Sequence, residues 1–459
     1  MTKKKSTVSR RTFLSSAAIA GASGAISAGG LLTSCSGNSD KKLTPLRPPS
    51  EYYIPNFTDK AIAGRPLKAA LIGCGQRGTG AAFDFISAGD DLSVISCADV
   101  FQDRMDRCRT RLKERRGNEI PDETSFIGFD AYKNAIDVPG VDVVLIASPT
   151  LWHPEHVKYA IDKGKHVFCE KPACIDAVGY RLFMQAVRQA QASGLSIVTG
   201  TQRHHQRAYV ESYKKVQEGH IGRITGGTVW WNQGHFDFRR RSPGETDMEY
   251  MLRDFFSWNW LCGDHVVDQG VHNVDVFCWF SHLKPVNAIA MGSQLRRITG
   301  DIFDNFSVDF EFEGGIHVHA MMRQIDNCHF RVAEFIQGTK GSWTTINEEF
   351  AIRDLDGNLI WKYDDEVAKN KFEQHNPYVL EHIDLVNHIR SGKAVNEAEI
   401  TAISSMACIM ARESAYSGNI TSWDELTQSD LSLMPAELHM GNVGMDKFTV
   451  PKQGTSPRY

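Results

Sequence analysis

Between residues 65 and 200, short apolar runs alternate with longer segments of helical periodicity. The runs have the length of buried strands, and they cover residues 66–72, 92–98, 141–147, 166–169 and 195–199. Helical segments are expected at 79–88 and in the stretches that end near residues 163 and 193. Strands that alternate with helices predict a parallel sheet with helices on both faces. We therefore expect a doubly wound α/β domain over residues 65–200.

From residue 201 the pattern changes to long runs with strand periodicity. A helix is expected at 209–218, and strand-like runs follow it at 224–233, 286–297, 303–313, 315–324 and 331–337. A late helix at 402–417 should pack back on the body of the protein. Long strand runs need a cover over their open face, which favours a homo-oligomer. We assign residues 201–430 to a second, α+β domain and residues 431–459 to a C-terminal extension.

The first 35 residues have the pattern of an export signal. Three lysines and the Arg10-Arg11 pair precede Phe13-Leu14 and an apolar stretch that glycines interrupt. This stretch is too weakly hydrophobic for a good membrane span. The pattern resembles a twin-arginine signal, and a disordered basic start is the alternative. Because that route exports proteins already folded, often with a cofactor bound, a cofactor is expected.

Residues 32–35, Leu-Thr-Ser-Cys, resemble a bacterial lipobox. Cleavage before Cys35 would free this cysteine to carry a lipid anchor. Residues 36–64 are polar and contain prolines, which is typical of a linker. The N-terminal sequence therefore predicts a bacterial protein that is exported, either in the periplasm or anchored to a membrane and facing the periplasm.

Composition limits the classes of partner. The formal net charge is −4 and the pI is near 6.5, so no overall charge attracts nucleic acid or an anionic membrane. With 42% hydrophobic residues among 459, the chain can bury sizeable cores. Its 10 cysteines include no C-x-x-C pair and no Cys/His cluster at zinc spacing. We expect mostly free thiols, no metal site and a small-molecule partner.

A glycine-rich turn follows the first predicted strand. Gly73, Gly75 and Gly78 form a G-x-G-x-x-G pattern between a strand and a helix, the order that a dinucleotide-binding Rossmann unit requires. Gly73 permits the tight turn, Gly75 lets a pyrophosphate approach the backbone, and Gly78 allows close packing of helix on strand. Glycines also mark ordinary turns, so the motif depends on its context.

That context includes Asp99, which ends the second predicted strand about twenty residues after the last glycine. A carboxylate there accepts hydrogen bonds from a ribose and repels a 2′-phosphate, so NAD is favoured over NADP. Arg77 and Arg104 lie nearby in sequence and would suit a phosphate. The alternative for Asp99 is a solvated turn residue.

Polar residues also follow the later strands. Ser148, Trp152 and His153 come after the strand at 141–147, and Glu170-Lys171-Pro172 follows the strand at 166–169. Ligands of open α/β sheets bind at these carboxyl ends. The ammonium group of Lys171 could orient and polarise a hydroxyl or carbonyl group of a substrate. An ordinary surface lysine is the alternative.

Asp268 and His272 stand four residues apart, which places them on one face if the segment is helical. Histidine suits proton transfer because its ordinary pKa lies near neutrality. An alcohol that is oxidised loses a proton as well as a hydride, so it needs a base. Asp268 could instead cap the following helix, and His272 could be structural.

Together these residues resemble the Gfo/Idh/MocA family, that of glucose-fructose oxidoreductase and inositol dehydrogenase. The resemblance covers about residues 67–418 and also includes Gly200-Thr201-Gln202-Arg203. It implies that Lys171, Asp268 and His272 are catalytic, with His272 as acid/base. It further implies that the cofactor is lined by Gly73, Gly75, Gln76, Arg77, Gly78, Asp99, Ser148, Trp152, His153, Glu170, Lys171 and Gln202.

The resemblance also implies a second domain built on a large open, mostly antiparallel sheet that covers the nicotinamide and serves oligomerisation. Sugars present apolar faces and hydroxyl rims, which aromatic and polar side chains match. Candidate substrate residues are Arg203, His204, Arg207, Trp230, Trp231, Gln233, Arg253, Trp258 and Trp260. The tryptophans could instead belong to the core.

Three functions fit these observations. The first is an exported NAD-dependent oxidoreductase that acts on a hydroxyl or ketone of a sugar or glycoside, with a tightly bound cofactor recycled by a second substrate. The second is a glycoside hydrolase that oxidises its sugar transiently, although that branch of the family lacks the lysine and the Asp/His pair. The third is a non-catalytic sugar-binding lipoprotein.

Overall fold

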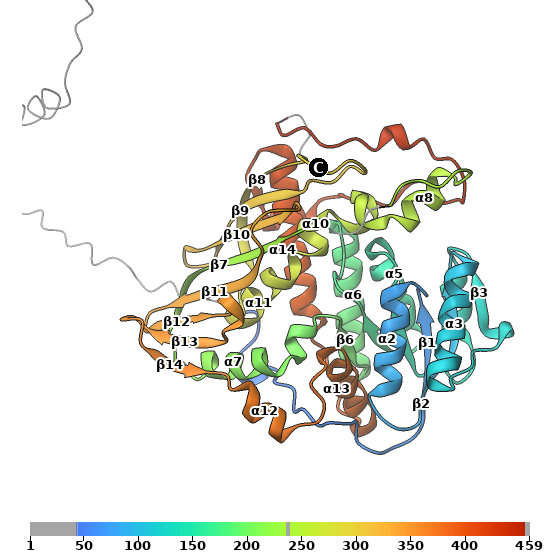
Figure 1. Ribbon diagram of the computed structural model, residues 1–459, viewed down its shortest axis with the longest axis horizontal. Coiled ribbons are helices and arrows are strands. Elements are labelled where there is room, and N and C mark those ends of the chain that lie inside the picture. Colours follow the sequence, from blue (N-terminus) through green and yellow to red (C-terminus); the bar gives the residue numbers. More distant parts are fainter. Residues whose placement is uncertain (1–42, 44, 236–238, 455–459) are drawn as a thin grey trace, which may run out of the picture. The chain divides into compact units, whose positions relative to one another are not determined.

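The computed structural model describes residues 43, 45–235 and 239–454. The predicted export signal and Cys35 lie outside the described residues. The described part forms one compact unit by its internal contacts. Figure 1 shows it as two packed regions, a parallel sheet with helices and a larger sheet.

The first region is a six-stranded sheet in the order β3-β2-β1-β4-β5-β6, and every neighbouring pair is parallel. Its strands are β1 (Leu67–Ile72), β2 (Leu92–Asp99), β3 (Ser125–Ile127), β4 (Val143–Ile146), β5 (His166–Cys169) and β6 (Ile197–Thr199). The predicted doubly wound α/β fold is confirmed. Strand β3 has no apolar run that would predict it, because it is short and none of its residues is buried.

Five helices connect these strands: α2 (Gln76–Ser87), α3 (Gln102–Arg116), α4 (Ala131–Asp137), α5 (His153–Asp162) and α6 (Ala177–Ser193). A further helix, α13 (Pro377–Ser391), comes from much later in the chain and packs against α2 and β6. Its buried residues Leu380 and Ile383 join the same hydrophobic cluster as Leu67. Part of the Rossmann core therefore comes from the region that the sequence assigned to the second domain.

The second region is a nine-stranded sheet in the order β14-β13-β12-β11-β7-β10-β9-β8-β15. Its strands are β7 (Ile224–Gln233), β8 (Pro285–Ser293), β9 (Asn305–Phe312), β10 (Ile316–Gln324), β11 (Arg331–Gly338), β12 (Gly341–Thr344), β13 (Ala351–Asp354), β14 (Leu359–Lys362) and β15 (Thr421–Ser422). All neighbours are antiparallel except β7 and β10. The predicted mostly antiparallel sheet is confirmed.

Helices cover one face of this sheet. Helix α11 (Val271–Ser281) packs on β7 and β11, and α14 (Ala398–Ser417) packs on β8 and also on α6, which joins the two regions. Smaller helices complete the region: α7 (Arg207–Gln217), α8 (Asp247–Arg253), α9 (Asn259–Cys262), α10 (His265–Asp268), α12 (Asp365–Lys371) and α15 (Trp423–Gln428).

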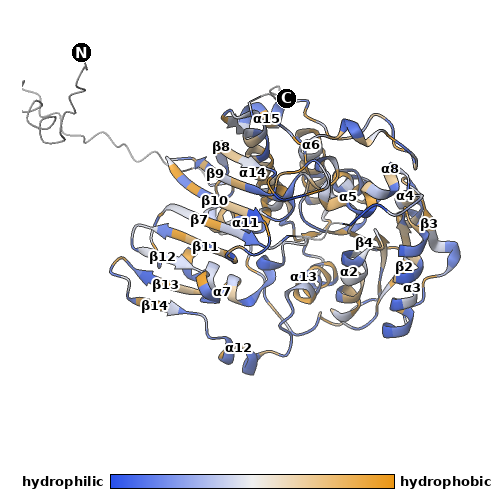
Figure 2. Cartoon of the chain, turned by 45° about the horizontal axis from the view of Figure 1, so that its top comes forward, coloured by the Kyte–Doolittle hydropathy of each residue, from blue (hydrophilic) through white to orange (hydrophobic). Residues whose placement is uncertain are grey.

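Along β8 to β10, buried side chains alternate with more exposed ones that point to the opposite face of the sheet. The strand colours alternate accordingly (Figure 2). Ile289, Met291 and Met321 are 50%, 66% and 43% exposed there. Within the described ranges, no helix combines the length and the apolar character needed to cross a bilayer. The nine described cysteines are unpaired, and eight of them are buried.

Candidate active site

The glycine turn has the geometry that its sequence predicts. Gly73 has a φ of +93°, and a Cβ there would lie 2.6 Å from the carbonyl oxygen of Ala147. A Cβ on Gly78 would collide with the carbonyl group of Gly73. Gly75 is different, because no described atom lies within 4 Å of its Cβ position. Gly75 caps α2, so the open space lies at a helix N-terminus.

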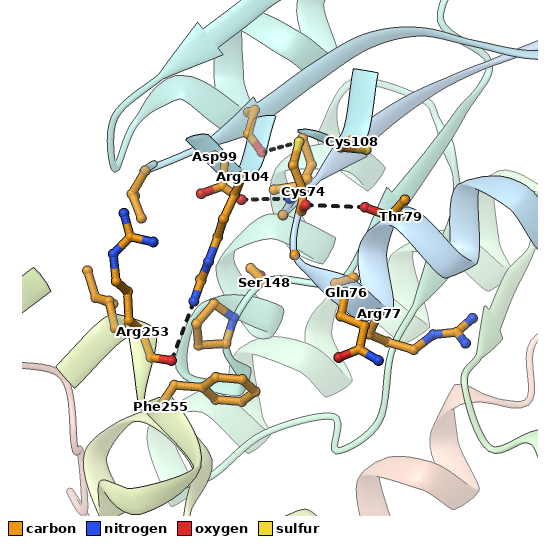
Figure 3. Close-up of a pocket in the computed structure, with 18 of the residues that line it drawn as sticks. Cys74, Gln76, Arg77, Thr79, Asp99, Arg104, Cys108, Ser148, Arg253 and Phe255 are labelled. Carbon is orange, nitrogen blue, oxygen red and sulfur yellow. Dashed lines mark hydrogen bonds between the residues drawn. The ribbon is translucent and has the colours of Figure 1, made fainter. Parts of the chain in front are cut away.

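A cavity of about 1230 Å³ lies in front of this turn. Residues at the carboxyl ends of β1, β2 and β4 line one side of it, including Gly75, Asp99 and Ser148. The other side comes from the second region and includes Leu252 and Phe255. Figure 3 shows these two walls facing one another, with Ser148 between them. The cavity therefore lies where a dinucleotide binds in this fold.

Asp99 lines the cavity at the end of β2. Its carboxylate accepts hydrogen bonds from the backbone N–H of Cys74, at 2.6 Å, and of Phe101, at 2.8 Å. Burial raises the pKa of Asp99 above its ordinary value, and these hydrogen bonds lower it in part. The contacts fix the carboxylate beside the glycine turn, where a ribose would approach.

Arg77 lines the cavity, but its guanidinium turns away from it (Figure 3). The group pairs with Glu170, at 2.6 Å, and with Asp84, at 2.9 Å. Its carbon lies 4.7 Å from the ring centroid of Tyr378. Arg77 and Glu170 thus hold each other behind the cofactor turn instead of facing a ligand. Of the two arginines that the sequence suggested for a phosphate, Arg77 and Arg104, only Arg104 therefore lies beside Asp99.

Some of the residues that follow β4 line the cavity, and another connects the loops next to it. Trp152 lines the cavity, and so does His156, which the sequence analysis missed. His153 does not line it. Its Nδ1 lies 2.7 Å from the carbonyl oxygen of Pro172, and its Nε2 lies 2.8 Å from that of Ser148. His153 therefore ties the loop after β4 to the loop that carries the predicted lysine.

Lys171 and Asp268 come together from the two regions of the protein. The Lys171 ammonium donates a hydrogen bond to the backbone carbonyl oxygen of Asp268, at 2.5 Å, and lies 3.6 Å from its carboxylate. The side chains are 13% and 7% exposed. A lysine so buried is no ordinary surface residue, and its ammonium is fixed in position.

His272 is 8% exposed and lies near this pair. Its ring stacks on Trp231, with centroids 5.2 Å apart and an angle of 18° between the ring planes. Burial, together with the cations Lys171 and Arg203, holds the pKa of His272 well below its ordinary value of 6.5. The imidazole is therefore neutral at neutral pH and able to accept a proton.

Asp268 and His272 do not share one helix, so the condition under which the two side chains would stand on one helix face is not met. Asp268 ends α10, and α11 begins after a break at Gly270. A Cβ on Gly270 would collide with the side chain of Met322. The alternative role of Asp268 as a helix cap is also wrong, because Gly270 occupies the cap position of α11.

Behind the histidine, Arg203 and Glu334 form a buried ion pair with 2.5 Å between Nη1 and Oε1. The Glu334 carboxylate, which is fully buried, also accepts hydrogen bonds from Asn273, Tyr209 and Thr345. Asn273 is the next residue after His272. One carboxylate on β11 therefore fixes the start of α11 and the Arg203 guanidinium together.

Several predicted substrate residues lie elsewhere. His204 is buried and contacts Asp275 at 2.6 Å, so it belongs to the core. Arg207 donates to the carbonyl group of Gln374 and packs on the ring of Phe372. Both predictions failed because the stretch that follows β6 turns its polar side chains into internal networks.

Three further predictions are corrected by strand alternation and packing. Trp230 points to the open face of the large sheet, where it meets Arg331, because its neighbour Trp231 points to the helix-covered face. Trp258 is buried against Tyr250 and Phe448. Trp260, 4% exposed, lies edge to face with Trp152.

Arg253 lines the cavity at the end that holds Asp99 and pairs there with Asp103, away from Lys171. Three further polar groups come from β7 and from the turn that follows β6. Gln233 shares the helix-covered face of β7 with Trp231, and Gln202 precedes Arg203. The buried atoms Gln202 Oε1, Trp231 Nε1 and Gln233 Nε2 have no hydrogen-bond partner among the described residues.

Known families match both regions of the chain. Residues 67–199 match the model of an oxidoreductase family with an NAD-binding Rossmann fold, and residues 209–344 match the GFO/IDH/MocA C-terminal domain. Together they span more than half of the chain. The chain belongs to the Gfo/Idh/MocA family. The predicted family is confirmed, and its N-terminal domain is of the NAD-binding type, as predicted.

Individual members of the family are distant. A myo-inositol 2-dehydrogenase of Thermotoga maritima is 27% identical over 234 residues, which are 50% of this chain and 59% of that protein. A glycosyl hydrolase family 109 protein of Streptomyces coelicolor is 28% identical over 226 residues, 48% of this chain and 44% of that one. The chain thus matches about half the length of these curated relatives.

The fold is shared more widely. The crystal structure of an aldose-aldose oxidoreductase from Caulobacter crescentus, complexed with glycerol, aligns with a TM-score of 0.60 at 18% identity. The alignment covers 78% of this chain and 100% of that one. The two proteins therefore share the two-region architecture of the family.

Proposed function

We propose that the protein is an NAD-dependent oxidoreductase that acts on a hydroxyl or ketone group of a sugar or cyclitol. The observation that carries this proposal is the approach of Lys171, Asp268 and His272 to one another, with Lys171 in the loop that His153 ties to Ser148 of the cavity wall. The inositol dehydrogenase among its relatives supports the substrate class.

The cavity suits a dinucleotide. At Gly75 the backbone borders open space that a Cβ would fill, and it lies at the N-terminus of α2, where N–H groups favour a pyrophosphate. Asp99 stands where the adenosine ribose would bind. A 2′-phosphate at that place would meet the Asp99 carboxylate, which repels it. These features favour NAD over NADP.

When bound, NAD supplies the acceptor for the hydride that leaves the substrate carbon. The Lys171 ammonium donates a hydrogen bond to the reacting oxygen and orients it, while Asp268 holds the lysine in place. His272, neutral because of its surroundings, accepts the proton of the hydroxyl group. In the reverse direction the same imidazole returns the proton to the carbonyl oxygen.

Polar atoms around the site suit a polyhydroxylated substrate. Among the described residues the indole N–H of Trp231 has no partner, and the amide groups of Gln202 and Gln233 add an acceptor and a donor. A substrate hydroxyl group bound at any of these three buried atoms would give that atom a hydrogen-bond partner.

A panel of sugars, glycosides and inositols mixed with the protein and NAD tests the proposal. We expect nicotinamide reduction, seen as an absorbance increase, with at least one polyol. The proposal fails if NAD binds and no member of the panel, as alcohol or as ketone with NADH, changes that absorbance.

A second function, NAD-dependent glycoside hydrolysis, has one supporting observation, the family 109 relative. Such an enzyme returns the hydride to the sugar and releases the aglycone with no net reduction of NAD. Nitrophenyl glycosides separate the two functions, since release of nitrophenol without net NADH would favour hydrolysis. The presence of Lys171, Asp268 and His272 favours the dehydrogenase.

We also propose export, from the twin-arginine pattern and the lipobox at Cys35. Free NAD is scarce outside the cytoplasm, so an exported enzyme would keep its cofactor and recycle it with a second substrate. Replacement of Arg10 and Arg11 by lysine should hold the protein in the cytoplasm, and Cys35→Ser should remove the lipid mass. Unchanged fractionation and mass would contradict this assignment.

A further inference from the structure

A segment of the second region closes the adenosine end of the cofactor cavity. We call residues 239–256 the strap. It contains α8 and the first two residues of the turn at Phe255–Ser257. Leu252, Arg253, Phe255 and Phe256 of the strap line the cavity opposite Asp99. Figure 3 shows Arg253 and Phe255 on the far wall from the glycine turn.

On its inner side the strap is tied to the Rossmann region. Arg253 makes a two-pronged ion pair with Asp103 of α3, at 2.6 and 3.1 Å. Its guanidinium carbon lies 3.9 Å from the ring centroid of Phe101, and Arg104 donates to the carbonyl group of Arg253 at 3.4 Å. These contacts are partly exposed, so alone they would resist opening weakly.

On its outer side the strap is held by the C-terminal extension. We call residues 441–448 the tail. The Asp247 carboxylate, at the start of α8, accepts hydrogen bonds from the backbone N–H groups of Val443, at 3.1 Å, and Gly444, at 3.0 Å. The backbone of α8 also donates hydrogen bonds to the tail. The N–H of Asp247 donates to the side-chain oxygen of Asn442, and the N–H of Met248 donates to the carbonyl group of Gly441.

An aromatic contact reinforces the tail. Phe448 packs against Trp258 and Trp260, with ring centroids 6.1 and 6.2 Å away. Trp260 in turn lies against Trp152, which lines the cavity. Figure 1 shows the red C-terminal segment running along the side of the molecule that carries α8. The tail therefore contacts two parts of the structure next to the cavity, the start of α8 and the tryptophan that packs on Trp152.

We infer that the tail fastens the strap over the adenosine half of NAD, so that the bound cofactor leaves slowly. The inference rests on the proposed function. Asp247 is a positioning residue here, because it acts on the cofactor through the strap. Neither family model reaches the tail, since the second ends at residue 344.

The test measures the rate at which NAD leaves the full-length protein, by mixing the loaded protein with an NAD-scavenging enzyme. Asp247→Ala and Phe448→Ala should each speed release about tenfold or more, since each removes contacts equivalent to at least one net hydrogen bond or a buried ring. NAD recovered from the purified variants should fall in step.

Asp365→Ala is the matched control. Asp365 also stands at the first position of a short helix, α12, and pairs with a nearby cation, Lys369, but it lies away from the cavity. Its variant should release NAD at the wild-type rate. Thermal unfolding of all variants identifies any that misfold, and Phe448→Ala carries the test if Asp247→Ala does not fold.

Unchanged release rates in both folded variants would overturn the inference and leave the proposed function intact. Failure of the wild-type protein to bind NAD at all would instead overturn the proposed function.

Discussion

The ammonium group of Lys171 donates a hydrogen bond to the main-chain carbonyl group of Asp268, and the two residues come from different regions of the fold. Lys171 follows β5 of the Rossmann sheet, whereas Asp268 ends α10 above it. This contact between Lys171 and Asp268 therefore exists only when the two regions are packed together.

The low pKa of His272 predicts the pH dependence of the reaction. Because burial and the facing cations Lys171 and Arg203 disfavour the imidazolium, the group should lose its basic form only well below pH 6.5. Lys171 and Arg203 are themselves paired with Asp268 and Glu334. We expect kcat/KM for alcohol oxidation to stay level as pH falls through 6.5 and to decrease only in more acidic solution.

The residual activity of Lys171→Ala supplies the control for this profile. Removing a cation near His272 should raise the pKa of the imidazole and move the acid limb to higher pH. An acid limb at the same pH in both proteins would contradict the assignment of that limb to His272. Stability follows the same sign, since the neutral buried ring contributes stability above its unfolded pKa and loses it as pH falls.

Two glycines of one turn should respond differently to alanine. Gly75→Ala places a methyl group in open cavity space, so the unfolding temperature should not change while NAD affinity falls about tenfold or more. Gly78→Ala drives a methyl group into the carbonyl group of Gly73, which should cost about 1–3 kcal/mol of folding free energy or more. Thermal unfolding and calorimetric titration with NAD check both expectations. Equal effects of the two changes on stability would contradict this geometry.

The buried pair of Arg203 and Glu334 should be needed for folding. Glu334→Gln leaves Arg203 buried without its counter-charge, so we expect a loss of about 3–5 kcal/mol in the free energy of unfolding. Glu349→Gln is the matched control, because Glu349 pairs with Arg353 in a partly exposed position and its loss should change stability little. Urea unfolding measures both variants, and a near-neutral Glu334→Gln would show that the pair is dispensable.

The open face of the large sheet should mediate self-association. Met291, 66% exposed on β8, stands on this face with Ile289 and Met321. Met291→Glu should shift the protein from an oligomer to a monomer in light scattering, because a charge would be buried in the interface. Val367→Glu, at an equally exposed site on α12, should leave the mass unchanged. A wild-type protein that is already monomeric would contradict the prediction.

The sequence predicted the parts of the site that local chemistry determines. Gly73, Gly75 and Gly78 act through their own backbone, and Lys171 and Asp99 end strands whose apolar patterns are clear, so all could be located by position. Glu334 could not, because along β11 it has the pattern of an ordinary polar strand residue. Its burial arises only when Arg203, Tyr209 and Asn273 converge on it from three other elements.

The same non-local effects account for the misplaced residues. Nothing in the order of Trp230 and Trp231 shows which one points to the covered face of the sheet, since this depends on the register with β10 and β11. Polar side chains such as His204 and Arg207 could match the hydroxyl groups of a sugar, but segments from later in the chain bury them. Asp275 of α11 and Gln374 before α13 are their actual partners.

The most direct test of the catalytic assignment compares the wild-type protein with a Lys171→Ala, His272→Ala double variant, both loaded with NAD, in a single turnover with a polyol that reduces the wild-type cofactor. Calorimetry should give equal NAD affinity for the two proteins, since neither side chain lines the cofactor cavity. Nicotinamide reduction should slow by about 10²–10⁴-fold in the variant, the usual contribution of acid–base groups. Reduction at the wild-type rate by the double variant would contradict the account.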